Sequence, residues 1–197
     1  DVHKLTAAEV FGVGVDDVTN EQRRIAKAIN FGLMYGMSAF GLAKQLGIGR
    51  SESQEYINSY FLKYPNVKDF IFNIRESAKD NGYVTTIFDR KLHFLDIKTA
   101  PGARREGILR SAINAPLQGS AADLIKRAMV LLDNKIKAKN LKSKLILQVH
   151  DELVLEVPDC ELEVLKDILE DSMVSAASLK VPLLVEIGVN SSWGGAH

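Results

Sequence analysis

The sequence has one cysteine, no long apolar run and no excess of charge of either sign. A single thiol, Cys160, excludes an intrachain disulfide and a metal cluster held by several cysteines, and it favours a reducing compartment. The apolar stretches fall short of the ~18 residues that span a membrane, and no signal-peptide pattern opens the chain. Basic and acidic residues number 25 each, so a surface for nucleic acid would have to be local.

Hydrophobic residues make up 46% of the 197-residue sequence, enough for a sizeable core in one large domain or two small ones. The sequence opens on Asp1 rather than methionine, so we expect a processed chain or a piece excised from a longer one.

Capping residues and apolar periodicity predict a helical first half and, in the second half, an antiparallel sheet backed by helices. Thr19 with Gln22 and Ser51 with Gln54 each form the pattern of a capping box. Helices are expected at residues 5–11, 19–35, 38–46, 51–60, 66–78, 102–138 and 161–177, and strands at 83–87, 92–95, 145–149, 153–157 and 183–187. Pro116 should break or kink the long helix, because it lacks a donor N–H.

One predicted helix carries a stripe that suits an extended anionic ligand. In RRIAKAINFGLMYG, Arg23, Lys27, Phe31 and Tyr35 fall four residues apart and share one helix face. The stripe is roughly 18 Å long at about 1.5 Å per residue. Its two cations suit phosphate oxygens, and its two rings suit a sugar or a base.

Two glycines, Gly32 and Gly36, follow the rings of this stripe. We expect them to let a large planar group approach the backbone, at a helix cost of about 1 kcal/mol each. The residues alone leave a second interpretation open, a surface helix with two solvated cations and two core aromatics.

The segment KLILQVHDELVLEV, residues 144–157, predicts a hairpin whose turn carries His150, Asp151 and Glu152. Two adjacent carboxylates on a rigid turn suit a hard divalent cation such as Mg2+. A site for two metal ions would need at least one more ligand from elsewhere. A solvated turn is the alternative, although such a turn has no need of an imidazole.

A third polar series consists of Arg110, Asn114 and Gln118, again four residues apart. Their polar ends would share one face and could contact minor-groove acceptors, sensing base-pair shape rather than sequence. The alternative is a helix bend with exposed polar residues. A basic run follows, which we interpret as a solvated loop rather than a phosphate track: Lys135, Lys137, Lys139, Lys142 and Lys144.

These three motifs, taken in their order along the chain, resemble those of family A DNA polymerases, and of the bacterial members above all. The spacing Arg23-x3-Lys27-x3-Phe31-x3-Tyr35 is similar to the family's nucleotide-binding motif, and QVHDE at 148–152 to its palm carboxylate motif. The series at 110, 114 and 118 is similar to the template-primer helix. The opening DVHKLTAAEVFG also resembles the family, and essentially the whole chain is covered.

The resemblance implies an α+β fold: part of a right-hand polymerase, with a helical fingers subdomain at residues 1–100 and the C-terminal part of a helix-backed antiparallel palm sheet at 101–197. It also implies DNA-directed DNA polymerase activity in replication and repair. A nucleotidyltransferase of this kind adds a dNMP from a dNTP to a primer 3′-hydroxyl and releases pyrophosphate, with two Mg2+ ions. We expect a bacterial cytoplasmic protein associated with the nucleoid.

Individual roles follow from the same resemblance. The phosphates of the dNTP would be held by His3, Arg23 and Lys27, with Lys27 also the proton donor to the departing pyrophosphate. Phe31 would lie against the sugar and Tyr35 near the templating base. Asp151 and Glu152 would be the catalytic metal-site carboxylates. The primer-template DNA would be contacted by Arg110, Asn114, Gln118 and His150.

Two departures from the family pattern matter. The family's other catalytic aspartate lies in an Asp-Tyr-Ser-like strand, and no such motif occurs in this sequence. We therefore expect the rest of the polymerase, including the thumb and part of the palm, to be a separate chain or segment, and this chain alone to be inactive. The family's Gly-Arg-Arg is also replaced by Phe88-Asp89-Arg90-Lys91, so Arg90 receives no role. The alternative function is a nonenzymatic nucleotide- and DNA-binding remnant.

Overall fold

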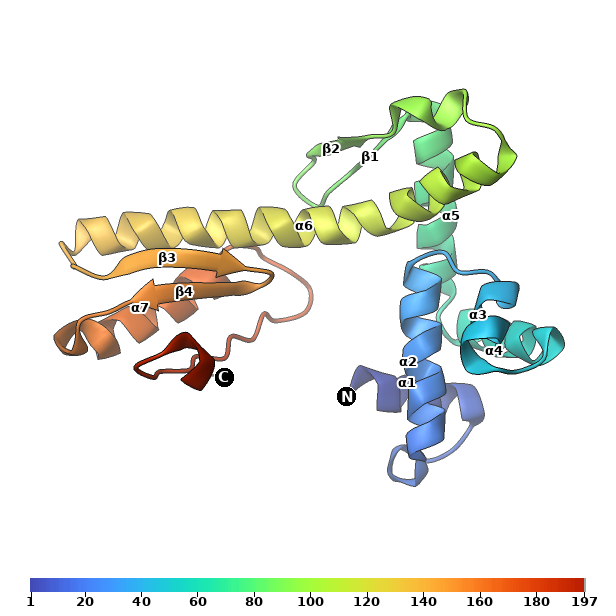
Figure 1. Cartoon of the computed structure of the whole chain (residues 1–197), viewed down its shortest axis with the longest axis horizontal. Helices are drawn as coiled ribbons and strands as arrows, with labels where there is room; N and C mark the ends of the chain where they lie inside the picture. Colours follow the sequence, from blue (N-terminus) through green and yellow to red (C-terminus); the bar gives the residue numbers. More distant parts are fainter. Residues whose placement is uncertain (197) are drawn as a thin grey trace. The chain divides into compact units, whose positions relative to one another are not determined.

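The computed structural model describes residues 1–196. Its chain divides into two compact units, Asp1–Gln118 and a second that begins at Gly119 (Figure 1). The described residues are mostly helical, with two antiparallel sheets of two strands each, so the α+β prediction is confirmed. No helix among these residues is long and apolar enough to cross a membrane.

Five helices open the first unit, and their ends follow capping rules. They are α1 (Val2–Phe11), α2 (Asn20–Met34), α3 (Ala39–Leu46), α4 (Arg50–Lys63) and α5 (Pro65–Asn81). The capping box of Thr19 and Gln22 begins α2 as predicted. Ser38 caps α3, and Gly47 ends it in the left-handed conformation.

The second predicted capping box is wrong. Helix α4 already begins at Arg50, after Gly49, so Ser51 lies inside its first turn and makes no cap bond. The helix also continues to Lys63, three residues beyond its expected end, and Tyr64 separates it from α5. A proline is tolerated at the first position of a helix, where its missing N–H has no intrahelical partner, and Pro65 begins α5 in this way.

Two apolar clusters hold the first unit together. One joins α1 to α4 around buried Ile29 and Leu42. The other lies between α5, the hairpin of β1 (Tyr83–Thr85) and β2 (Lys91–His93), and the start of α6, with Val84, Ile97 and Leu109 at its centre. The predicted hairpin is thereby confirmed.

The long helix α6 spans Gly102–Ala138, with the predicted bounds. It is continuous through Pro116, which is buried, so of the predicted break or kink the break does not occur. A proline removes one intrahelical donor, and the residues on both sides of Pro116 remain helical. Residues 102–118 of α6 belong to the first unit and 119–138 to the second.

The second unit is a hairpin packed on helices. Strand β3 (Lys144–Val149) pairs antiparallel with β4 (Glu152–Glu156), and α7 (Leu162–Val174) follows. Apolar side chains of the hairpin pack with Leu132 of α6 and Leu165 of α7. Short 3-10 helices complete the described chain at Val15–Asp17, Leu95–Lys98, Asp159–Glu161 and Trp193–Gly195.

The strand predicted at residues 183–187 is not formed. The side chains there alternate between half-buried and exposed, as in an extended segment, and Leu184 is 91% exposed. A strand needs a partner to complete its backbone hydrogen bonds, and the described sheets pair only β1 with β2 and β3 with β4.

Aromatic residues are divided unequally along the chain. All five tyrosines and eight phenylalanines lie at or before Phe94, in the first unit. The single tryptophan, Trp193, lies in the second unit.

Candidate functional site

The stripe of α2 lies on the exposed side of the helix. Its opposite side is buried, with Ile25, Ile29 and Leu33 in the core of the first unit. Phe31 is 40% exposed and Tyr35 46% exposed, so they are not core aromatics and that interpretation is wrong. Burying one face of α2 therefore leaves the cations and rings of the other face accessible to a ligand.

Helix α1 brings His3 to this exposed face. The centroids of the His3 and Phe31 rings are 5.3 Å apart, and those of Phe31 and Tyr35 are 6.4 Å apart with nearly parallel planes. Partial burial, together with the nearby charges of Arg23 and Lys27, lowers the pKa of His3 below its ordinary value of 6.5. The five predicted nucleotide-binding residues thus form one row.

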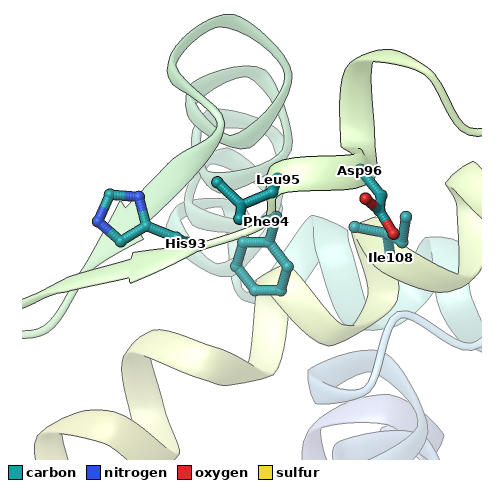
Figure 2. A pocket seen from close by; sticks show the side chains of 5 residues that line it. All are labelled: His93, Phe94, Leu95, Asp96 and Ile108. Carbon is teal, nitrogen blue, oxygen red and sulfur yellow. The ribbon is translucent and has the colours of Figure 1, made fainter.

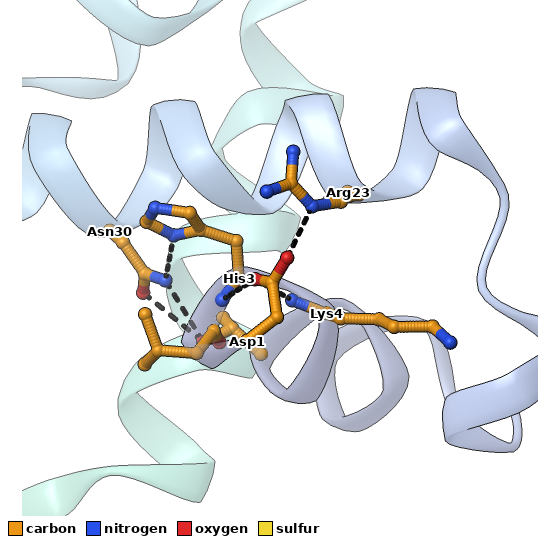
Figure 3. Close-up of polar contacts among 7 residues, drawn as sticks. Asp1, His3, Lys4, Arg23 and Asn30 are labelled. Carbon is orange, nitrogen blue, oxygen red and sulfur yellow. Dashed lines mark hydrogen bonds and ion pairs between the residues drawn. The ribbon is translucent and has the colours of Figure 1, made fainter. Parts of the chain in front are cut away.

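Asp1 has two structural functions beside the row (Figure 3). Its Oδ1 accepts the backbone N–H groups of His3 and Lys4 and caps α1. Its Oδ2 accepts Nε of Arg23 at 2.7 Å. The two Nη atoms of Arg23 point away from Asp1 in Figure 3, so this pair orients the guanidinium without using its outer donors.

The residue pattern did not indicate Asn30, a buried polar residue behind the row. Asn30 is 8% exposed, and its Nδ2 lies 3.1 Å from Nδ1 of His3 and 3.0 Å from Oγ1 of Thr6. Thr6 is also buried, at 3% exposure. One feature of the sequence could have indicated Asn30, namely its position on the apolar side of α2. A buried amide there must form hydrogen bonds with nearby groups.

The two glycines that follow the rings have close neighbours within the chain, and the expectation that they make room for a planar ligand stays a prediction. A Cβ at Gly32 would lie 3.2 Å from Sδ of Met37. Gly36 has φ +67°, and a Cβ there would lie 2.9 Å from Ile113 Cδ1 and 3.1 Å from Arg110 Cγ. Gly36 therefore ends α2 where α6 approaches it closely.

This approach places the start of the predicted DNA-binding series beside the end of the α2 stripe, within the first unit. Arg110 and Gln118 are exposed and Asn114 is half-buried, whereas Leu109, Ala112 and Ile113 are buried. The three polar side chains therefore lie on the accessible side of α6, at the helical spacing the sequence predicts.

The predicted carboxylates lie at one end of the β3–β4 hairpin, in the second unit. Val149 pairs with Glu152, so the turn consists of His150 and Asp151 alone. Glu152 is the first residue of β4 and not a turn residue, which corrects that part of the prediction. His150 has φ +50°, and its carbonyl accepts Nε2 of Gln148 at 2.6 Å.

His150 and Asp151 are exposed, and Glu152 is half-buried. Carboxylate oxygens at such a tip suit a hard divalent cation. Across residues 1–196, however, the structure contains no group of three or more histidine, cysteine, aspartate or glutamate side chains that could hold a metal ion. The chain's own donors at this tip are therefore the two adjacent carboxylates.

A carboxylate on the far side of the second unit anchors the entry to β3. Glu161 accepts the backbone N–H groups of Lys142 and Ser143 and the hydroxyl of Ser143, at 2.6–3.0 Å. The bonds from Lys142 and Ser143 lower the pKa of Glu161 below its ordinary value of 4.5. In the basic run, Lys135 pairs with Asp171 and Lys137 with Asp133.

Two hollows of the first unit lie away from the row. One, of about 350 Å³, is lined by His93, Phe94, Leu95, Asp96 and Ile108 (Figure 2). Another, of about 510 Å³, lies between α4 and α5, with Ile57, Phe61 and Lys68 in its wall. Neither is lined by a residue of the predicted sites.

The chain is similar in sequence to known DNA polymerases. The model of the family described as "DNA polymerase family A" matches residues 1–195. The chain is 53% identical over 197 residues to DNA polymerase I of Pseudomonas aeruginosa and 50% identical over 193 residues to that of Caldicellulosiruptor bescii. It covers 22% and 23% of these two proteins, about a fifth of their length.

A solved structure agrees with the same assignment. The POL domain of Pol1 from M. smegmatis, in complex with DNA primer-template and dNTP, superposes with a TM-score of 0.93 at 40% identity. The match covers 100% of this chain and 35% of that one. Residue pattern, fold and overall similarity agree, and the chain belongs to DNA polymerase family A.

Proposed function

We propose that the chain is the nucleotide-binding and partly catalytic portion of a DNA-directed DNA polymerase, which adds a dNMP to a primer 3′-hydroxyl and releases pyrophosphate. The observation that carries the proposal is the accessible row of His3, Arg23, Lys27, Phe31 and Tyr35, of which the last three are exposed, in a family A chain. The similar M. smegmatis domain, described as a complex with DNA primer-template and dNTP, supports DNA and dNTP as ligands.

The cationic end of the row binds the triphosphate. Arg23 offers its outer guanidinium nitrogens as a fork while Asp1 holds its Nε. Lys27, exposed one turn further along α2, supplies a compact charge and the proton for the departing pyrophosphate. His3 adds a third phosphate contact from α1.

The aromatic end of the row binds the rest of the nucleotide. Phe31 lies against the sugar, with its ring fixed between His3 and Tyr35. Tyr35 lies near the templating base, at the end of α2. Arg110, Asn114 and Gln118 contact the primer-template along the accessible side of α6, and His150 lies near the primer end.

The hairpin tip contributes carboxylates to a metal site. Bound divalent ions, which we take to be two Mg2+, would stabilise the charge on the attacking and leaving oxygens of an in-line displacement. Asp151 and, beside it, Glu152 have the hard oxygen donors that suit such ions. They are neighbours on one hairpin, so a carboxylate opposite Asp151 must come from residues outside this sequence.

The parts of the right-hand fold follow from these roles. We assign residues 1–100 to the fingers and 101–197 to the C-terminal part of the palm. The partner is the remainder of the polymerase, as a separate chain or a further segment. The protein acts in DNA replication and repair in the bacterial cytoplasm, at the nucleoid.

A second function is a nonenzymatic nucleotide- and DNA-binding remnant. The observation in its favour is that the described residues contain no three-donor metal group. The two functions differ in whether polymerase activity appears when the rest of a polymerase is added. A remnant stays inactive after that addition.

Primer extension separates these two functions. The 197-residue chain is assayed alone and together with the part of the Pseudomonas aeruginosa polymerase that the match leaves out, supplied as a separate chain. We expect no extension by either chain alone and template-dependent extension by the mixture, abolished by Asp151→Ala. Inactivity of a mixture that binds both dNTP and DNA would favour the remnant.

Two further substitutions in the active mixture test the assignment of the helices. Lys27→Ala should lower the rate of the chemical step by about 100-fold or more, because a positioned proton donor is lost. Gln118→Ala should weaken primer-template binding with little change in dNTP affinity. The reverse pattern would mean that α2 and α6 have been assigned to the wrong ligands.

A further inference from the structure

We propose that Asn30 is a positioning residue, which fixes His3 as the neutral tautomer with its proton on Nε2 and so provides one directed donor to the triphosphate. This inference rests on the proposed function of the α2 row. It extends that function to a buried residue of the same helix that is not part of the stripe.

The hydroxyl of Thr6 determines which groups donate and which accept in this network. Its hydroxyl lies 2.9 Å from the carbonyl oxygen of Val2, which can only accept, and 3.3 Å from Oδ1 of Asn30. A hydroxyl has one proton, and the shorter bond to Val2 uses it. Oγ1 of Thr6 is then an acceptor for Nδ2 of Asn30, at 3.0 Å.

The second N–H of the same amide is directed at His3. Nδ2 of Asn30 lies 3.1 Å from Nδ1 of His3, and Figure 3 shows the amide between the imidazole and the start of α1. A nitrogen that accepts a hydrogen bond carries no proton, so a neutral His3 must have its proton on Nε2. Asn30 and Thr6 are both buried, so water does not compete for these bonds.

The environment of the ring keeps it neutral and oriented. Burial and the charges of Arg23 and Lys27 lower the pKa of His3. The Phe31 ring packs against the imidazole at 5.3 Å between centroids. With Nδ1 bonded to Asn30, Nε2–H is the donor left for a phosphate oxygen, and no tautomeric rearrangement is needed when the ligand binds.

The first measurement needs no nucleotide. The 197-residue chain is labelled with 15N-histidine, and long-range 15N–1H correlations are recorded well above pH 6.5, with His3→Gln identifying the His3 signals. The wild-type spectrum should show the Nε2–H tautomer alone. Asn30→Leu, which removes the amide and keeps the same number of non-hydrogen side-chain atoms, should give a mixture of tautomers. Asn73→Leu, on exposed α5, is the matched control and should change nothing.

The second measurement is the affinity for dATP with Mg2+. Asn30→Leu should weaken binding roughly three- to tenfold, the loss expected when one hydrogen bond of ordinary strength is no longer aligned. Asn73→Leu should bind as the wild type does. If the wild-type chain binds no dATP, the proposed function fails, and the tautomer measurement still decides the positioning by Asn30.

Several results would overturn the proposal. They are an Nδ1–H or mixed tautomer in the wild type, an unchanged tautomer in Asn30→Leu, and an altered tautomer with unchanged dATP affinity. If Asn30→Leu does not fold, Asn30→Asp replaces it. A carboxylate can only accept, so Asp at position 30 should move the His3 proton to Nδ1, and persistence of the Nε2–H form would count against the proposal.

Discussion

Gly36 shows why the end of α2 requires a residue without a side chain. Its φ of +67° is unfavourable for any other residue, and an added Cβ would meet Ile113 and Arg110 of α6. Gly47, which ends α3 with φ +70°, has open space where its Cβ would be. A side chain at Gly47 would therefore cause backbone strain alone, whereas one at Gly36 would cause both backbone strain and steric contact.

We expect Gly47→Ala to lower the free energy of unfolding by about 1 kcal/mol through backbone strain alone. Gly36→Ala should cost about 1–3 kcal/mol more, because side chains of α6 must also move. Urea denaturation followed by circular dichroism measures both. Equal losses for the two variants would mean that α6 does not pack closely on Gly36.

At this scale the sequence predicted the row of α2 but not its supports. Spacing by four residues is enough to place Arg23, Lys27, Phe31 and Tyr35 on one helix face. The contacts of His3 with Phe31 and Asn30 depend on how α1 packs against α2, across 27 or more positions of sequence. Local periodicity carries no information about such pairs, so Asn30 was not predicted.

Among the elements, the entry to β3 depends on a single carboxylate. Glu161 satisfies two backbone N–H groups and one hydroxyl beyond the end of α6. Its pKa is lowered in the folded chain, so folding favours its ionised form. This contribution to stability is complete above pH 4.5 and is lost as the pH falls through the lowered pKa.

Glu161→Gln should therefore destabilise the chain at neutral pH, and the difference from the wild type should shrink as the pH falls below 4.5. Urea midpoints measured by circular dichroism between neutral and acidic pH test this. Glu163→Gln, which removes only an exposed ion pair with Lys166, is the control. A difference that stays constant with pH would contradict the assigned role of the charge.

Elements were predictable where their cause is local. The capping box at Thr19 and the bounds of α6 follow from nearby residues, and both were predicted. The prediction of a strand at 183–187 was wrong, because β-propensity does not show whether a neighbouring strand is available for pairing. Ser51 was misassigned because the N-cap of α4 is Gly49, two residues earlier, which makes no side-chain cap bond.

At the scale of the whole molecule, balanced charge limits how strongly DNA can be attracted. The formal net charge is zero, so DNA binding depends on a few local cations. Arg110 is exposed beside the end of α2, whereas Lys137 already pairs with Asp133.

Duplex affinity should therefore fall only gently with salt. Arg110→Ala should reduce the slope of log affinity against log salt by about 1. Lys137→Ala should leave the slope unchanged. Filter binding of radiolabelled primer-template at several salt concentrations measures the affinity and its slope. An effect of Lys137 equal to that of Arg110 would mean that the basic run contacts phosphates after all.

The unequal division of aromatic residues gives each compact unit its own spectroscopic signal. Tryptophan emission can come only from Trp193, so it reports on the second unit. Tyrosine absorbance and near-ultraviolet dichroism of the tyrosines report on the first unit. During one denaturant titration, the two signals will coincide if the units unfold as one cooperative body and separate if they do not. The native chain therefore carries the probes needed to establish whether its parts fold independently, without any added label.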